Sequence, residues 1–394
     1  MASYFGLKTA GSFLPLVVRL ILAYHHAVML VEGGRAGASR LSMEEDLELD
    51  RQLNILNKPP IKSMHTRWGD IFDCVEFHDQ LAFDHPLLKN HVFSKKKETT
   101  QASPHKKLMS QIEGCPKGTV PIRRTTKEDL IRAKKISSSS NGGGAGDEYR
   151  VGITLGIQDK LFFGASGVTN IWHPYVNHPG QFSAAEMVLQ AGTTGQTNEI
   201  KVGWTVNPSL YGDAMTRSFA HWTGGNNTGC YNNLCPGFVQ LHSTYTPVMA
   251  FENTSIISGT QVKMGWYIHL ELENGNWWLS LLIDESFIEV GYWPGELFPL
   301  LKQGAERIYW GGRVKAGNDA ITPEMASAFY PNDDNDHTGS YENLKYYDQN
   351  EEFWMADHKA HPQSVNDCKG RYDAIWDDSK SILRYGGPGG DTCY

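Results

Sequence analysis

The stretch "EIKVGWTV", residues 199–206, carries a two-residue pattern. Apolar residues alternate along it with polar or small ones: Ile200, Val202 and Trp204 against Glu199, Lys201 and Gly203. Successive side chains of a β-strand point to opposite faces of the sheet. The alternation therefore predicts a strand with one face packed in a core and the other face directed away from it.

Similar runs recur from Tyr149 to the C-terminus, separated by Gly, Asn and Pro. They include "YRVGITLGI", "QVKMGWYIHLELE", "WWLSLLI", "FIEVGYW" and "RIYWGGRV". No long segment has helical periodicity, so residues 149–394 are predicted to form an all-β antiparallel sandwich or barrel. The abundant aromatic residues favour a sandwich core, and a carbohydrate-binding platform is the alternative.

The part of the chain before this β-rich region has a different texture. "SSSSNGGGAG" begins a segment, residues 137–148, that reads as a flexible linker because Ser and Gly cannot bury a core. Before it, residues 60–136 are predicted to form a small α+β unit that ends in a helix. Thr126 is the expected N-cap of that helix, with Asp129 three residues later.

The amino end has the features of a secretory signal. Lys8 precedes the apolar run "FLPLVVRLILAYHHAVMLV", and "AGA" supplies a small-x-small cleavage pattern. We expect residues 1–38 to be a cleaved signal peptide that directs the protein to the extracellular space, with no stable membrane association afterwards. An uncleaved anchor is the alternative, although Arg19 interrupts the apolar run.

The net charge of −8 is unevenly distributed. Residues 1–146 carry 21 Lys and Arg against 15 Asp and Glu, whereas residues 147–394 carry 15 against 29. A basic first part and an acidic second part suit pairing between a prosegment and its body. Nucleic acid is an unlikely partner of the acidic part because phosphates would be repelled.

The six cysteines indicate disulfides rather than a metal site. No CxxC or Cys/His cluster with zinc spacing is present, and His358 and His361 have no evident third ligand, so no metal or other cofactor is expected. Order along the chain alone leaves fifteen possible pairings. Two sequons make Asn226 and Asn253 candidate glycosylation sites.

Several longer motifs resemble one known family. "GDIFDCVEFHDQLAFDHPLLKNH" and "CPKGTVPIRRTTKEDLIRA" resemble the activation peptide of the plant neprosin family. "VGWTVNPSLYGDAMTRSFAHWT", "GCYNNLCPGFVQ", "GYWPGELF" and "YGGPGGDTCY" resemble the neprosin domain, in the family's order. The resemblance implies a secreted zymogen of a glutamic endopeptidase that cuts after proline in acid. It also implies an antiparallel β-sandwich and three disulfides: Cys74–Cys115, Cys230–Cys235 and Cys368–Cys393.

The two catalytic positions of that family are substituted in this chain. The first glutamate belongs to an Ile-Glu-Ala-Gly-Trp motif, and the aligned residue here is Lys201. The second follows Trp-Gly-Gly, and the aligned residue here is Arg313. Such a peptidase needs one ionised and one protonated carboxyl group. Arginine holds its proton and only donates hydrogen bonds, so the dyad is predicted to be absent.

Two glutamates and four motif residues complete the candidate site. Glu186, at a position where the family often has glutamine, and Glu199, two residues from Lys201, are candidates for a relocated dyad. The resemblance places the expected cleft beside the Gly-Gly motif, with Trp204, Trp310, Gly311 and Gly312.

Two functions remain open from the sequence. The first is a catalytically impaired homologue that keeps its cleft for a peptide, protein or glycan ligand and pairs with its own propeptide. The second is an active acid endopeptidase with a relocated carboxyl dyad. In the first case Lys201 and Arg313 are expected to attract an anionic ligand.

Overall fold

The computed structural model describes residues 42–93, 113–141 and 147–394, except 159, 194–195, 226–227, 284–285, 333, 351, 358, 392 and 394. The expected signal peptide and Asn226 therefore lie outside the described residues. The chain divides into two compact units, Met1–Leu49 and Asp50–Tyr394, and helix α2 (Met43–Leu56) crosses that boundary. Within the described residues, every helix is too short or too polar to cross a membrane.

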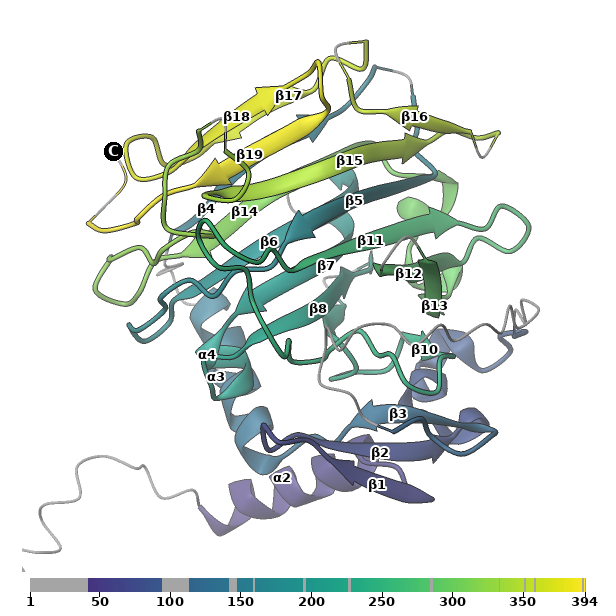
Figure 1. The fold of residues 1–394 in the computed structure, drawn as a ribbon. Coiled ribbons are helices and arrows are strands. Elements are labelled where there is room, and N and C mark those ends of the chain that lie inside the picture. The colour runs from purple at the N-terminus through teal and green to yellow at the C-terminus, as the bar shows by residue number, and fades with distance from the viewer. Residues whose placement is uncertain are drawn as a thin grey trace, which may run out of the picture. The chain divides into compact units, whose positions relative to one another are not determined.

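A small α+β unit precedes the sandwich in the chain (Figure 1). Its antiparallel sheet has the order β1-β2-β3, with β1 at Lys62–His65, β2 at Ile71–Glu76 and β3 at Thr119–Arg123. Helix α3 follows at Lys127–Asn141. Thr126 Oγ1 accepts from the Asp129 backbone N–H at 3.1 Å, and Asp129 Oδ2 accepts from the Thr126 N–H at 2.9 Å. This reciprocal cap confirms the predicted helix start.

Helix α3 continues beyond its expected end. The sequence places the linker at residues 137–148, but the helix extends through Asn141, and β4 begins at Glu148. Serine has only a modest cost in a helix, so an established helix can propagate through the serine run.

Three disulfides join the cysteines: Cys74–Cys115, Cys230–Cys235 and Cys368–Cys393. These are the pairs that the family resemblance implied. The first closes the α+β unit by tying β2 to the segment before β3. The other two lie within the β-rich region, so no disulfide among the six cysteines joins that region to the α+β unit.

The first large sheet has seven strands in the order β17-β4-β14-β6-β7-β8-β9, all antiparallel. Its strands are β17 (Gln363–Asn366), β4 (Glu148–Leu155), β14 (Arg307–Lys315), β6 (Phe182–Thr193), β7 (Gln196–Val206), β8 (Thr216–Thr223) and β9 (Gly229–Tyr231). A short helix, α4 (Pro208–Tyr211), connects β7 to β8.

The second large sheet follows the order β10-β13-β12-β11-β5-β15-β19-β18, and β16 pairs with β15. Its strands are β10 (Val239–Gln240), β13 (Ser286–Trp293), β12 (Trp277–Ile283), β11 (Lys263–Leu270), β5 (Gly164–Asn170), β15 (Gly339–Tyr347), β19 (Ile382–Gly386), β18 (Asp373–Asp377) and β16 (Phe353–Met355). The two sheets enclose one large apolar core, which makes the fold an antiparallel β-sandwich.

Trp204 and Trp310 belong to that core. Both are fully buried, and their indole N–H groups reach across to the other sheet. Trp204 Nε1 donates to Asn170 O at 3.0 Å, and Trp310 Nε1 donates to Ser166 O at 3.2 Å. The expectation that these two residues line a cleft is therefore wrong. The strand alternation directs them inward, away from Lys201 and Arg313.

Gly312 also faces the core, whereas Gly311 does not. A Cβ on Gly312 would approach Met325 Sδ and Tyr385 Cδ2, both inside the sandwich. A Cβ on Gly311 would instead meet Val151 O and Tyr309 Oη. Of the four residues expected in the cleft, only Gly311 shares a sheet face with Arg313.

Candidate functional site

Lys201 and Arg313, the positions at which the resemblance predicts catalytic glutamates, lie on the outer face of the seven-stranded sheet, here called the polar face. Residues opposite each other in register share a face, so the strands form rows across it. Three rows run from β4 through β14, β6 and β7 to β8. The first is Arg150, Arg313, Ala184, Thr205 and Arg217; the second is Gly152, Gly311, Glu186, Gly203 and Phe219; the third is Thr154, Tyr309, Val188, Lys201 and His221. A fourth row begins at β14 and contains Arg307, Gln190, Glu199 and Thr223. Lys201, Arg313, Glu186 and Glu199 are therefore all on one face.

Lys201 is paired with Glu199. Its Nζ lies 2.7 Å from Glu199 Oε2, and the two side chains are 10% and 13% exposed. Burial, and next the positive charge of Arg313, lower the pKa of the Lys201 ammonium. Burial raises the pKa of Glu199, but Lys201 together with Arg150 and Arg313 more than offsets this, so the net pKa of Glu199 is lowered. Glu199 thus favours the ionised form and is a poor proton donor.

Arg313 has partners on several sides. Its guanidinium lies 3.4 Å from Glu186 Oε2 and 3.6 Å from Glu148 Oε2, and Nη2 donates to Tyr231 Oη at 3.3 Å. The ring of Phe182 stacks 4.8 Å from the guanidinium carbon. Burial alone would lower the pKa of Arg313, but Glu186 and Glu148 raise it well above its usual value. Arg313 is therefore a fixed, compensated cation.

Glu186 occupies the centre of this arrangement. On β6 it lies between Ala184, which is opposite Arg313, and Val188, which is opposite Lys201. Its side chain is fully buried, and Arg150 Nε lies 3.6 Å from its Oε1. Two guanidinium groups thus flank a single carboxylate.

Glycines on the neighbouring strands make room beside Glu186. Gly203 of β7 and Gly311 of β14 are its direct neighbours in register. A Cβ on Gly203 would overlap the carbonyl oxygen of Ala185, and one on Gly311 would overlap that of Val151. A residue with a side chain at either position would therefore clash with the backbone of the neighbouring strand.

Several residues of this face were not identified from the sequence, among them Arg150, Tyr309 and His221. His221 lies opposite Lys201 and its ring centroid is 4.4 Å from that of Tyr231. Burial, then Lys201 and Arg313, lower the pKa of His221 well below its usual value. Tyr309 Oη donates to Gly312 O at 2.7 Å, and burial followed by Glu186 raises the pKa of Tyr309. The alternation of "YRVGITL" assigns Arg150 to one strand face, but only long-range pairing brings it to Glu186.

The cluster contains equal numbers of acids and bases. Its basic members are Arg150, Lys201 and Arg313, and its acidic members are Glu148, Glu186 and Glu199. Each base lies within 4 Å of at least one of these carboxylates. When all six are charged, these residues form a network of ion pairs with no net charge. The arrangement differs from the two adjacent carboxyl groups that a glutamic peptidase needs.

Two further candidate features were a glycosylation site and a metal site. Asn253 is exposed in a segment outside helices and strands, between β10 and β11, which is where an acceptor asparagine must lie. Across the part of the chain that the structure describes, no three His, Cys, Asp or Glu side chains gather in a way that could hold a metal ion.

Comparisons with known proteins match both parts of the chain. The sequence model described as Neprosin activation peptide matches residues 63–145, and the model described as Neprosin matches residues 179–388. The first matched range contains β2, β3 and α3, and the second contains most of the strands of the sandwich.

Solved peptidases resemble this chain only weakly. Scytalido-glutamic peptidase with a peptide-based transition state analogue is 9% identical, with a TM-score of 0.37 over 61% of this chain and 98% of that chain. SCP-B, a member of the Eqolisin family in a complex with a tripeptide, is 11% identical, with a TM-score of 0.33 over the same shares. At such low similarity the assignment depends on the family models. The Neprosin match alone covers more than half of the 394 residues, and the chain belongs to the neprosin family.

Proposed function

We propose that this chain is a secreted, non-hydrolytic member of the neprosin family that binds a peptide or protein ligand without cutting it. One observation carries the proposal: Glu186 lies between Lys201 and Arg313, and all three side chains belong to a compensated ion-pair network. Hydrolysis by a glutamic peptidase requires a base to activate water and a protonated acid to assist the leaving group. Neither substituted position supplies a carboxyl group.

A relocated dyad of Glu186 and Glu199 is less well supported. The register puts Glu199 opposite Gln190, four residues from Glu186 along β6, and Lys201 lies between them on β7. Glu199 is held by Lys201, and Glu186 is held by Arg150 and Arg313. A catalytic dyad needs two neighbouring carboxyl groups, because each shifts the pKa of the other so that one is protonated and one is ionised. Here the close partners of each carboxylate are cations instead.

The ion pairs also change the expected ligand chemistry. Two unpaired cations would have favoured an anionic ligand, but Lys201 and Arg313 each have a carboxylate partner. We therefore propose a ligand without a required negative charge, and the family's substrate class favours a peptide over a glycan. The disulfides agree with passage through an oxidising compartment, which supports secretion.

The decisive test is an attempt to restore activity. The purified protein, incubated with proline-containing peptides from strongly acidic to neutral pH, is expected to show no cleavage. Lys201→Glu with Arg313→Glu rebuilds the two family carboxyl groups, but the second change places a new carboxylate beside Glu148 and Glu186. The triple variant that adds Glu186→Gln is therefore expected to recover more activity than the double variant, and either single variant almost none.

Each outcome is informative. Cleavage by the unmodified protein that Glu186→Gln or Glu199→Gln abolishes would establish the relocated dyad instead. Cleavage that survives both changes would come from other groups and would equally overturn the proposal. Circular dichroism of each variant checks that the sandwich is still folded.

A further inference from the structure

The activation unit, defined here as residues 50–141, makes several contacts with the sandwich. One of them is a buried ion pair. Arg217 of β8 lies in the same row of the polar face as Arg313. Its Nη1 donates to Asp70 Oδ2 at 2.5 Å, and the two side chains are 1% and 3% exposed. Arg123 donates to the other Asp70 oxygen at 2.7 Å, and Asp213 accepts from Arg217 Nη2 at 2.7 Å. Removing Asp70 would leave Arg217 with one of its two carboxylates.

A second contact is a pair of hydrogen bonds between Gln80 and the backbone of Gln240. Gln80 Nε2 donates to Gln240 O at 3.1 Å, and the Gln240 N–H donates to Gln80 Oε1 at 2.7 Å. The residues are 1% and 0% exposed. The side-chain amide of Gln80 thus hydrogen-bonds the backbone N–H and C=O of β10 at the edge of the sheet, as a neighbouring strand would. Buried backbone groups that lose such partners are costly.

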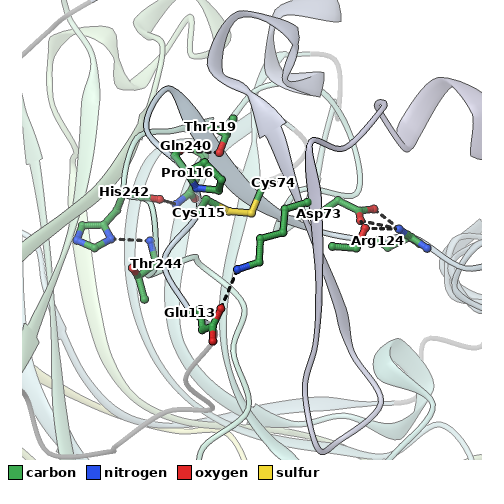
Figure 2. The surroundings of a disulfide bond; sticks show 12 residues. Asp73, Cys74, Glu113, Cys115, Pro116, Thr119, Arg124, Gln240, His242 and Thr244 are labelled. Atoms are coloured by element: carbon green, nitrogen blue, oxygen red, sulfur yellow. Dashed lines mark hydrogen bonds and ion pairs between the residues drawn. A yellow bond between two sulfur atoms is a disulfide. The ribbon is translucent and has the colours of Figure 1, made fainter.

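The third contact lies beside the Cys74–Cys115 disulfide. Figure 2 shows this disulfide next to the turn that contains His242 and Thr244 of the sandwich. The Cys115 N–H donates to Ser243 O at 2.8 Å. The disulfide therefore holds a hydrogen-bonding segment of the activation unit against the sandwich.

A fourth contact between the activation unit and the sandwich is apolar. Ala82 of the activation unit is buried with Val239, Trp278 and Tyr292 of the sandwich, and Phe77 packs against the same cluster. His91 Nε2 lies 3.0 Å from Tyr292 Oη. These residues come from β10, β12 and β13, so the cluster is on a different sheet from Arg217.

We propose that the activation unit is a permanent subunit of this protein and stays bound after the chain between α3 and β4 is cut. The body surface formed by Arg217, Gln240, Ser243 and the apolar cluster is then a protein-binding surface whose partner is the chain's own activation unit. The opposite net charges of the two parts favour the same pairing. Net charge acts over the whole surface and is screened by salt, whereas these contacts are buried.

The physical reason is the number of separate contacts. Cutting the chain between α3 and β4 removes only the effective concentration that a covalent connection provides, of order mM, and leaves every contact described above in place. The ion pair lies on one sheet, and the two buried amide hydrogen bonds and the apolar cluster lie on the other. All of these contacts must break together before the activation unit leaves the sandwich. The inference concerns assembly and does not depend on whether the polar face hydrolyses peptides.

The test uses the folded, full-length protein. Residues 142–146 are replaced by the recognition sequence of a site-specific protease, and the folded protein is cut at neutral pH. Size-exclusion chromatography at low micromolar concentration is expected to give one peak that contains both fragments, resolved only on a denaturing gel. Two separate peaks at neutral pH would overturn the proposal.

Matched variants identify the surface. Asp70→Asn is expected to weaken the association of the cut fragments roughly tenfold or more, because it leaves Arg217 and Arg123 without their shared buried carboxylate. Asp79→Asn makes the same charge change at an exposed position of the same unit and is expected to have an effect below about twofold. Gln80→Ala tests the second contact if Asp70→Asn does not fold. Equal dissociation constants for the Asp70, Asp79 and Gln80 variants would rule out this surface.

Discussion

Individual side chains on the polar face carry charges that compensate one another. The family resemblance places glutamates at the positions of Lys201 and Arg313 and often a glutamine at that of Glu186. Here the outer two positions are basic and the middle one is acidic, so each substitution compensates the others. Burying Lys201 or Arg313 without a carboxylate would be strongly unfavourable, and Glu186 with Glu199 removes that cost.

Glu186 is therefore expected to be a stability residue. Glu186→Gln leaves Arg313 buried with only Glu148 as an acidic partner and should lower the free energy of unfolding by about 3–5 kcal/mol. Glu148→Gln removes the other acidic partner of Arg313, but the Glu148 side chain is 46% exposed. Its expected cost is below about 1 kcal/mol because solvent screens the pair. Urea denaturation of both variants measures the difference, and equal costs would contradict a central role for Glu186.

Among the structural elements, the turn after β10 is sensitive to acid. His242 Nδ1 accepts the backbone N–H of Thr244 at 3.0 Å (Figure 2). It also accepts the backbone N–H of Tyr245 at 3.0 Å, and both hydrogen bonds require an unprotonated nitrogen. Burial lowers the pKa of His242 to about 4. Protonation would remove the acceptor for both N–H groups. The same turn carries Ser243, which accepts from Cys115, so its geometry also bears on the activation unit.

The sign of the pH effect follows from the lowered pKa. The folded state binds a proton at His242 less readily than the unfolded state, so the stabilisation is present above pH 6.5 and is lost as the pH falls through 6.5 toward 4. Between pH 6.5 and pH 4 the free energy of unfolding should fall by about 3 kcal/mol. His242→Asn retains an acceptor that does not titrate and should lack this part of the pH dependence. Urea denaturation at neutral and acidic pH compares the two, and parallel curves would exclude His242.

Over the whole chain, the helix that ends the activation unit limits where a protease can cut. Helix α3 continues through Asn141 and β4 begins at Glu148, and a protease needs an extended segment in its active site. We expect amino-terminal sequencing of the processed protein to find new ends between residues 142 and 148. Ends at Lys134 or Lys135 would show that α3 opens before cleavage.

Much of the fold follows from local patterns. The alternation in residues 199–206 identified a strand and also which residues face the core, because side-chain direction in a strand has a fixed period of two. That same alternation placed Trp204 in the core, opposite to Lys201, although the motif resemblance put both at one cleft. Thr126 and Asp129 marked the start of α3 because an N-cap acts within a single turn.

The sequence by itself predicted that Lys201 and Arg313 stand where the resemblance places glutamates, since a motif position can be compared without knowing the fold. Only the tertiary structure decided what surrounds them. Arg150 reaches Glu186 because β4 and β6 both flank β14, and Asp70 reaches Arg217 across 147 residues. Strand order and docking between distant segments depend on long-range pairing, which leaves no local period in the sequence.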